Sequence, residues 1–425
     1  MQAGRIAERH KRRWPRALGA LGLFALVATA AVGRAEKQRI GTDFHVFWQA
    51  GHDFAHGLPL YQPLEGARTL LYPPFAAQAF QSLAVFPLKP AAALFYAANV
   101  FLILAAVWLT RDIVRRLEGE ERQQRLALIL AIVLSGQFVL NNLNLLQVNL
   151  VIFVLCLLGA RGIALGRPWA VGWIVTATLI KITPIFFVVW AVVRGGRRTF
   201  QAALAVGLGG LLLPVAQRGP SLGTADLTAY YNSFLQQFAA GGVVSIYTNQ
   251  TIGAMVYRAI TIPKSPQRFE YHYLSSLQPF APVIYRTLAV IIFSVFLLHL
   301  FRLAKARQPF TSFEIASVFL VGHLLSGVTW KAHLVTLLFV FYSLLALDHR
   351  ALHRGSRFGL GAAWLGMAVI GLAGRDLMGS TIHHYVGGYS VFVWVMLLLL
   401  ILCIALSSGS LPGLHGSARS AVPSH

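Results

Sequence analysis

Long uninterrupted apolar blocks limit what this chain can fold into more than any other feature of its sequence. Several approach the roughly 20 residues that an α-helix needs to cross the hydrocarbon core of a bilayer. Of the 425 residues, 56% are hydrophobic and 12% are charged, whereas an ordinary soluble chain carries about 25% charged residues. The alternative, a soluble protein with a very large buried helical core, fits this composition poorly. The sequence therefore predicts an all-α polytopic membrane protein.

The breaks between the apolar blocks predict about twelve transmembrane helices within a single membrane domain over residues 1–406. The expected helices cover residues 17–34, 91–110, 126–142, 145–160, 168–181, 184–194, 199–215, 282–301, 311–328, 334–348, 358–374 and 389–406. Three inner ranges are shorter than a full crossing, and such helices are tolerated at membrane depth where they line a cavity enclosed by protein. The basic N-terminus resembles that of a signal peptide, but because many more spans follow we favour an uncleaved first helix. The Gly/Ser/Pro-rich residues 407–425 are expected to form a disordered tail.

The distribution of positive charge predicts the orientation in the membrane. The formal net charge is +22, with 36 Lys and Arg against 14 Asp and Glu. If the N-terminus is cytoplasmic, the predicted cytoplasmic segments hold 23 of the 36 Lys and Arg, and the opposite side holds 12. This bias follows the positive-inside rule. We therefore expect a multi-pass protein of the cell inner membrane (plasma membrane), with both termini cytoplasmic and two large outer loops, at about 35–90 and 216–281. Since no basic run is interleaved with aromatic residues, nucleic acid is not expected as a partner.

Neither the cysteines nor the histidines form a recognisable metal pattern. Cys156 and Cys403 lie inside apolar blocks, which indicates neither a disulfide nor a metal framework. Two histidine pairs stand out. One is His52 with His56, and the other is His383 with His384. No HExxH-like pattern or carboxylate-rich cluster completes either pair, so we expect no protein-bound catalytic metal.

Asp43 is the acidic residue best placed for proton transfer. It follows the first predicted helix and is flanked by Phe44 and Phe47. A carboxylate beside apolar rings near a membrane surface is a better base than one in water. The alternative is a helix N-cap, in which Thr42 or Asp43 caps a short helix that ends near Gln49. The two roles do not exclude each other.

Tyr72 belongs to a stretch of aromatic residues and prolines in the first outer loop. Pro73 and Pro74 follow it, and a proline biases its predecessor toward an extended backbone. The loop is therefore expected to be rigid. A rigid aromatic loop can hold a sugar ring or a lipid chain, and it can equally anchor the protein at the membrane interface.

Amide side chains and a lysine interrupt the apolar blocks in the middle of the chain. The amides are Asn141, Asn142, Asn144, Gln147 and Asn149. They suit either the wall of a cavity or hydrogen bonds between helices. Lys181 precedes Pro184 at a helix break. A cation there is costly unless it meets an anion, such as a phosphate, or reaches the membrane surface.

Two further groups of polar residues lie in the second half of the chain. Asn249 and Gln250 suit sugar hydroxyls, and Arg258 suits a phosphate; the alternative is a capped interfacial helix that begins near Thr248. A second group lies at an outer helix end and consists of Trp330, Lys331 and His333. An ammonium and an imidazole at that position can clamp a phosphate and share proton transfer, whereas a lone lysine there would be an interface anchor.

The order of these motifs resembles that of a known superfamily. An Asp after the first helix is followed by G-x-P-x-Y, Y-P-P-F, N-x-x-Q-x-N, K-I-T-P, T-N-Q-T and T-W-K-A-H. Over roughly residues 40–340 this resembles the GT-C glycosyltransferases, and among them glycosyltransferase family 87, the polyprenol-phosphate-mannose-dependent mannosyltransferases. The resemblance implies a GT-C fold and a polyprenyl-phosphate sugar donor used on the extracytoplasmic face.

The resemblance also implies roles for individual residues. It makes Asp43 the base, and it matches Lys181, Asn249, Gln250, Trp330, Lys331 and His333 to substrate-binding positions. We add His45, Tyr72 and Arg258 as substrate-binding candidates, although His45 departs from the shared pattern. The expected partners are the lipid-linked donor, a lipid or glycan acceptor and membrane lipids, and no cofactor is expected beyond that donor. A transporter or flippase of lipid-linked sugars is the alternative, but no repeat between the two halves is evident.

Overall fold

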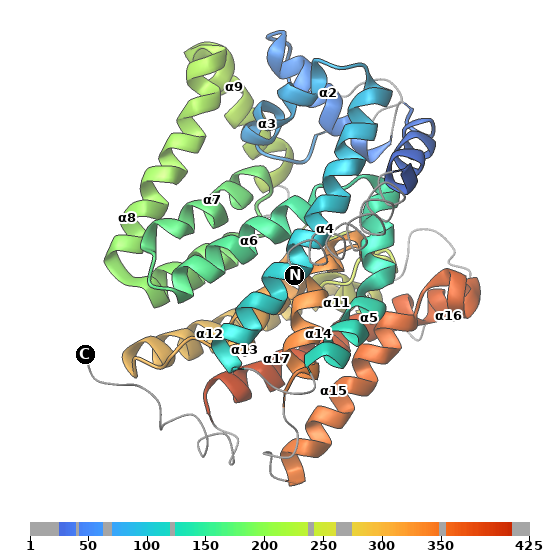
Figure 1. The fold of residues 1–425 in the computed structure, drawn as a ribbon, viewed down its shortest axis with the longest axis vertical. Helices are drawn as coiled ribbons and strands as arrows, with labels where there is room; N and C mark the ends of the chain where they lie inside the picture. Colours follow the sequence, from blue (N-terminus) through green and yellow to red (C-terminus); the bar gives the residue numbers. More distant parts are fainter. Residues whose placement is uncertain are drawn as a thin grey trace, which may run out of the picture.

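The computed structural model describes residues 25–39, 42–62, 70–119, 124–236, 242–260, 274–347 and 354–409. Within these ranges the chain is helical and contains no β-strand, as Figure 1 shows. The predicted tail lies outside the described residues apart from its first three positions. The all-helical class that the apolar blocks predict is thus confirmed.

The helices follow one another with short breaks. After a first helix at Ala25–Ala35, they are α2 (Asp43–Ala55), α3 (Pro74–Ala84), α4 (Leu88–Glu118), α5 (Gln124–Leu145), α6 (Asn149–Ala164), η1 (Pro168–Ala170), α7 (Val171–Ile180), α8 (Ile185–Arg218), α9 (Pro220–Tyr230), η2 (Tyr231–Leu235), α11 (Ile252–Ile260), η3 (Ser275–Phe280), α12 (Ala281–Lys305), α13 (Ser312–Leu325), η4 (Lys331–Thr336), α14 (Leu337–Leu345), α15 (Arg354–Leu372), α16 (Arg375–Gly388) and α17 (Val391–Ser407).

Among the described residues, four helices are long and apolar enough to cross a membrane. They are Leu88–Glu118, Gln124–Leu145, Ile185–Arg218 and Ser276–Lys305. A fifth crossing results if α15 and α16, which meet at an angle of 107°, are counted as one broken span. Six further apolar helices have 10–17 residues. The chain is therefore a multi-pass membrane protein, while the number of about twelve crossings stays a prediction.

The kink in α8 agrees with the expected helices, whereas three short helices were not expected. Residues 184–194 and 199–215, expected as separate helices, lie in the element α8, which a kink at Gly196, with φ 71°, divides into two helices. Glycine takes this left-handed conformation without steric cost. The segments expected as outer loops contain the short helices α3 and α9, and α16 lies between the expected ranges 358–374 and 389–406. These three helices were not predicted because they carry no long apolar run.

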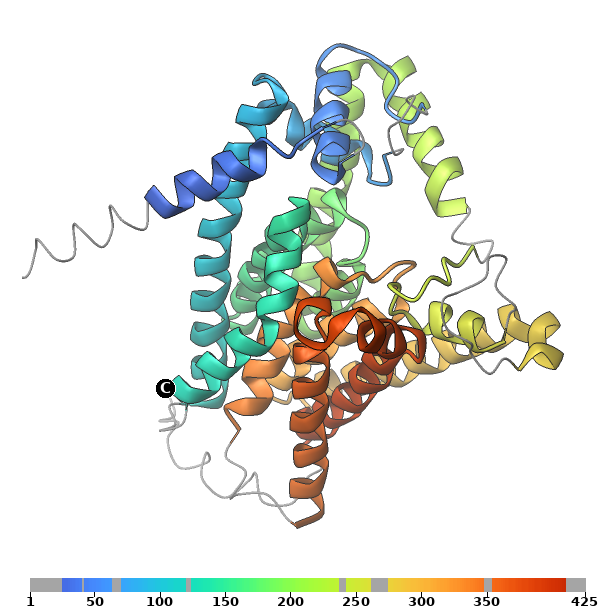
Figure 2. The ribbon, with the colours of Figure 1, turned by 90° about the vertical axis from the view of Figure 1, so that its right-hand side faces the viewer.

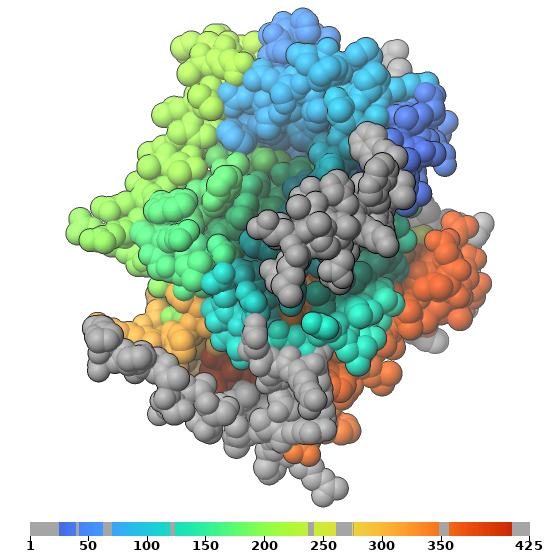
Figure 3. Space-filling model, in the orientation of Figure 1, coloured from blue at the N-terminus to red at the C-terminus, as the bar shows by residue number. Residues whose placement is uncertain are grey.

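Helices α2, α3 and α9 lie together at one end of the molecule, and α4 runs from there toward the opposite end (Figures 1 and 2). On the face drawn in Figure 3, the surface of this end consists of these segments. The backbones of α2 and α3 are in close contact at Gly51. A Cβ on this residue would lie only 2.6 Å from the carbonyl of Phe80. Phe47 stacks on Phe80 with ring centroids 4.9 Å apart. Gly51 therefore permits the close contact that fixes α2.

Arg218, the last residue of α8, links α8 and α9 to α2 through an ion pair and hydrogen bonds. Its Nε lies 2.7 Å from the carboxylate of Asp226, and both side chains are buried. Its Nη1 and Nη2 atoms donate to backbone carbonyls at the C-terminus of α2, those of Asp53, Phe54 and Leu58. Because helix C-termini leave carbonyls without intrahelical partners, Arg218 stabilises the end of α2 from a different part of the chain.

Ion pairs also join helices elsewhere in the molecule. Asp112 of α4 accepts hydrogen bonds from Arg116 and from Arg161 of α6, both at 2.7 Å. Arg194 of α8 pairs with the fully buried Glu314 of α13 at 2.6 Å. A buried charge of this kind needs its partner, so these pairs explain several of the charges inside an otherwise apolar molecule.

Candidate active site

Asp43 is the first residue of α2. Thr42 occupies the N-cap position with an extended backbone, but its side chain makes no capping hydrogen bond, and the helix continues to Ala55, beyond the expected end near Gln49. The Asp43 carboxylate lies at a helix N-terminus, where a negative charge is favoured. Its Oδ2 accepts a hydrogen bond from Nε2 of Gln147 at 2.6 Å. Asp43 thus starts the helix and also contacts the amide-rich break between α5 and α6.

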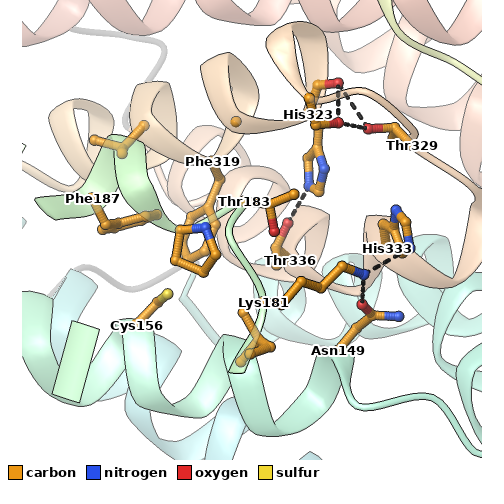
Figure 4. A pocket seen from close by; sticks show the side chains of 15 residues that line it. Asn149, Cys156, Lys181, Thr183, Phe187, Phe319, His323, Thr329, His333 and Thr336 are labelled. Carbon is orange, nitrogen blue, oxygen red and sulfur yellow. Dashed lines mark hydrogen bonds between the residues drawn. The ribbon is translucent and has the colours of Figure 1, made fainter. Parts of the chain in front are cut away.

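Lys181 lies in the break between α7 and α8. Its backbone is extended, with φ −151° and ψ 127°, so the chain leaves the helical path there. Its Nζ donates to Oδ1 of Asn149 at 2.8 Å and lies 2.9 Å from Nε2 of His333 (Figure 4). The ammonium also lies 5.7 Å from the ring centroid of Tyr72. The lysine is therefore held by residues from three distant parts of the chain.

Amides connect the carboxylate side of this site with the lysine side. Asn142, which is fully buried, donates from Nδ2 to the carbonyl of Gln147 at 3.2 Å and lies 3.4 Å from Oδ1 of Asn99. Its Oδ1 accepts from Nδ2 of Asn149 at 3.2 Å. Asn149 combines both alternatives that the sequence left open for these amides, because it lines a cavity and donates to the carbonyl of Ala332.

Tyr72 packs between the two sides. Its ring lies 4.8 Å from that of Phe47 on α2, and its carbonyl accepts a hydrogen bond from the Tyr61 hydroxyl at 2.7 Å. Burial raises the pKa of Tyr72, and the negative charge of Asp43 raises it further. The phenol therefore stays neutral at physiological pH and can act as a hydrogen-bond donor.

His45 is buried two residues beyond Asp43 on α2. Its ring lies 6.1 Å from that of Trp48, and its Nδ1 has no hydrogen-bond partner among the described residues. Burial lowers the pKa of His45, and the nearby Asp53 carboxylate opposes this in part. A neutral imidazole with an unsatisfied nitrogen lies close to the carboxylate in sequence and on the same helix.

A cavity lies beside Lys181 and His333 (Figure 4). Its volume of about 50 Å³ accommodates a few water molecules and is too small for a sugar ring. Polar side chains line one part, namely Asn149, Lys181, Thr183, His323, Ser326, Thr329, His333 and Thr336. Apolar side chains line the rest, including Cys156, Phe187 and Phe319. The ammonium thus borders a space with both polar and apolar walls.

Asn249, Gln250 and Arg258 form a second group with bonds to the chain itself. Asn249 is fully buried; its Oδ1 accepts from the backbone N–H of Thr329 at 2.9 Å. The side chain of Gln250 donates to the carbonyls of Tyr247 and Gly387. Arg258, on α11, donates to two backbone carbonyls and to the Ser390 hydroxyl. These bonds support the turn that leads to Trp330 and His333, and the proposed substrate contacts of these three residues stay a prediction.

The three candidate residues of the T-W-K-A-H motif, Trp330, Lys331 and His333, have different neighbours. The His333 ring is near that of Trp330, with centroids 6.3 Å apart and planes inclined by 17°. Its imidazole contacts Lys181, as described above. Lys331 lies beside Gly374, at the break between α15 and α16. Only His333 of this motif therefore makes direct contact with Lys181 in the described structure.

Asn99 and His323 contribute to the site region but were not predicted. Asn99 is fully buried in α4 and meets Asn142. His323 lines the cavity, and its Nε2 lies 2.6 Å from the hydroxyl of Thr336. A single polar residue inside an otherwise apolar block is the sequence signal that marks both of them.

The described residues contain no group of three or more His, Cys, Asp or Glu side chains that could hold a metal ion. Cys156 and Cys403 are buried free thiols. The sequence-based expectation that catalysis uses no bound metal stays a prediction.

The described helices thus bring a carboxylate, an amine and an imidazole into one polar network within a membrane protein. Comparison with protein families gives the family: the sequence model of glycosyltransferase family 87 matches residues 70–327, more than half of the chain. The chain belongs to glycosyltransferase family 87 and is a membrane glycosyltransferase. Comparison with curated proteins finds no match.

The family match confirms the resemblance seen in the motifs and disfavours the transporter alternative. It extends over Tyr72, Lys181 and the group around Asn249, which all lie between residues 70 and 327. Asp43 precedes the matched range and His333 follows it. The roles of these two residues are therefore argued from the structure and the chemistry of their side chains.

Proposed function

We propose that this glycosyltransferase moves a sugar, mannose, from a polyprenyl-phosphate donor to a hydroxyl of a lipid or glycan acceptor, with inversion at the anomeric carbon. Asp43 acts as the general base. The observation that carries this proposal is the polar chain from Asp43 through Gln147, Asn142 and Asn149 to Lys181. It holds a carboxylate and a cation in one site. Removal of the acceptor proton needs the carboxylate, and stabilisation of the leaving phosphate needs the cation.

On the acceptor side, Asp43 takes the proton of the attacking hydroxyl. The acceptor oxygen forms a bond to the anomeric carbon while the bond from that carbon to the phosphate oxygen breaks, through an oxocarbenium-like transition state. The electron pair of the broken bond leaves with the polyprenyl phosphate. Because a phosphate is a good leaving group at neutral pH, the reaction requires no general acid.

On the donor side, Lys181 stabilises the charge that develops on the leaving phosphate. An ammonium has three N–H donors; one is directed to Asn149 and another to His333, which leaves the third for a phosphate oxygen. Preorganised positive charge of this kind contributes strongly to transition-state stabilisation. The adjacent cavity, whose lining includes Phe187 and Phe319, places apolar side chains near this ammonium.

We also propose that the reaction takes place on the extracytoplasmic side, with both termini in the cytoplasm. The bias of Lys and Arg in the sequence supports this orientation. Helix α4 supports it as well: its first residues lie near α2 and α3, and its last turns carry Arg111, Arg115 and Arg116. A basic helix end of this kind suits the cytoplasmic surface of a membrane.

The test is transfer by purified protein in nanodiscs, supplied with labelled polyprenyl-phosphate sugars and a lipid extract from the host. Mass analysis identifies the product, and NMR of the anomeric proton gives the stereochemistry. We expect Asp43→Asn to abolish transfer while the protein stays folded, and Glu36→Gln, at an exposed carboxylate, to keep it. Transfer by Asp43→Asn at the wild-type rate, or a product with retained anomeric configuration, would contradict the proposed mechanism.

A further inference from the structure

The break between α5 and α6 contains a backbone conformation that its sequence does not favour. Leu146 has φ 51° and is fully buried. A non-glycine residue in the left-handed region is uncommon and energetically unfavourable. Such conformations persist where surrounding structure requires them, and they concentrate at functional sites. The turn at Leu146 determines the position of the residue that follows it, Gln147.

The backbone of Gln147 is fixed on both sides by one residue. Its N–H donates to the carbonyl of Asn142 at 3.1 Å, and its carbonyl accepts from Nδ2 of Asn142 at 3.2 Å. Asn142 is itself fully buried. The left-handed turn at Leu146 and the two bonds to Asn142 together hold Gln147 in one place.

The side chain of Gln147 has Asp43 as its hydrogen-bond partner. A carboxylate can only accept, so Nε2 must face Asp43, as it does at 2.6 Å. Oε1 is buried and has no partner among the described residues. Burying an unsatisfied amide oxygen costs free energy, and the charge-assisted bond from Nε2 to Asp43 offsets part of that cost.

We infer that Gln147 is a positioning residue for Asp43. Its side-chain Nε2–H donates to the Asp43 carboxylate and holds it in one orientation, and this bond favours the ionised form, which is the form that accepts a proton. The inference rests on the proposed function in so far as Asp43 is the base of the transfer reaction. The effect of Gln147 on the ionisation of Asp43, however, can be measured with or without turnover.

The test variant is Gln147→Met, which keeps the length of the side chain and removes the donor. We expect kcat to fall by about tenfold or more with the KM for the donor little changed. Because the ionised carboxylate loses a hydrogen bond, the acid limb of the pH–rate profile should move upward by about one pH unit. Gln147→Asn, whose amide is one methylene too short to reach, should shift the profile in the same direction.

Gln137→Met is the matched control. Gln137 lies on the same helix, α5, and its side chain donates to the carbonyls of Ile370 and Gly371. The control loses comparable hydrogen bonds without touching Asp43. It should therefore keep the wild-type pH profile, even if it lowers stability.

A measurement that needs no turnover separates this inference from the proposed reaction. Infrared bands that disappear in Asp43→Asn report whether Asp43 is ionised, and their titration gives its midpoint in each variant. The inference predicts a higher midpoint in Gln147→Met than in wild type. An unchanged midpoint overturns the role of Gln147, even if wild type transfers mannose. A raised midpoint in a protein that transfers no sugar supports the role of Gln147 and contradicts the proposed function instead.

Discussion

The Nζ atom of Lys181 lies 2.9 Å from Nε2 of His333, although 152 positions separate the two residues in the sequence. A protonated lysine can only donate, so Nε2 must be the unprotonated nitrogen of the imidazole. On the other side of the ring, Nδ1 lies 3.1 Å from the carbonyl of Val328 and 3.3 Å from the backbone nitrogen of Trp330. These contacts fix the position of the His333 ring, and its contact with Lys181 holds that side chain beside the cavity.

Replacing Lys181 with Met should slow the transfer reaction strongly. The ammonium is the cation that we assign to the leaving phosphate, and loss of one such preorganised group typically lowers kcat by about 100-fold or more. Lys89→Met is the control, because Lys89 is exposed and pairs with Glu36 at the surface. Steady-state kinetics with the polyprenyl-phosphate donor checks both variants. Equal kcat values for Lys181→Met and wild type would exclude Lys181 from the reaction.

Gly51→Ala should destabilise the protein and reduce transfer. The added Cβ would lie 2.6 Å from backbone atoms of Phe80, so α2 and α3 must separate, at a cost of about 1–3 kcal/mol. Since α2 carries Asp43, activity should fall as well. Chemical unfolding in detergent gives the free energy. Gly136→Ala serves as the control, because its Cβ would meet nothing within 4 Å, and it should stabilise the helix by about 0.4–1 kcal/mol.

His45 should make the stability depend on pH. Burial lowers the pKa of His45 below its ordinary value of 6.5, so the unfolded chain takes up a proton that the folded protein resists. The free energy of unfolding should therefore fall as the pH drops below about 6.5, by at most about 1.4 kcal/mol per pH unit from this residue. His45→Gln should reduce that slope. Equal slopes in wild type and His45→Gln would contradict this account.

The sequence predicts the longer helices of this fold well. Residues 282–301 and 389–406 were expected to be helical, and the structure has Ala281–Lys305 and Val391–Ser407. Lipid requires long apolar runs, and such runs are visible without knowledge of the partners. Helices α3 and α9 pack against neighbouring helices of the chain through a few residues each. Their composition therefore contains no comparable signal.

The site is predicted in its residue types but not in its connections. Asp43, Lys181 and His333 were candidates because a charged or titratable group near apolar segments is costly without a purpose. Their contacts depend on how α2, α7 and η4 pack, which no local pattern encodes. The left-handed backbone at Leu146 is the clearest example, because leucine has no preference for that conformation. In the sequence, Gln147 was therefore only one of five amides, and its contact with Asp43 is visible in the structure alone.

Gln147 and Asn149 are two positions apart, and one contacts Asp43 while the other contacts Lys181. A single short turn therefore sets the separation between the proposed base and the proposed phosphate-binding cation. The turn is buried, and Asn142 forms hydrogen bonds with both Gln147 and Asn149. These bonds couple the positions of the two residues. In the proposed reaction, the attacking hydroxyl and the leaving phosphate oxygen lie on opposite sides of one anomeric carbon, so their separation is the same for every donor and acceptor. Residues 147–149 would hold the base and the cation at one fixed separation that serves this geometry before any substrate binds.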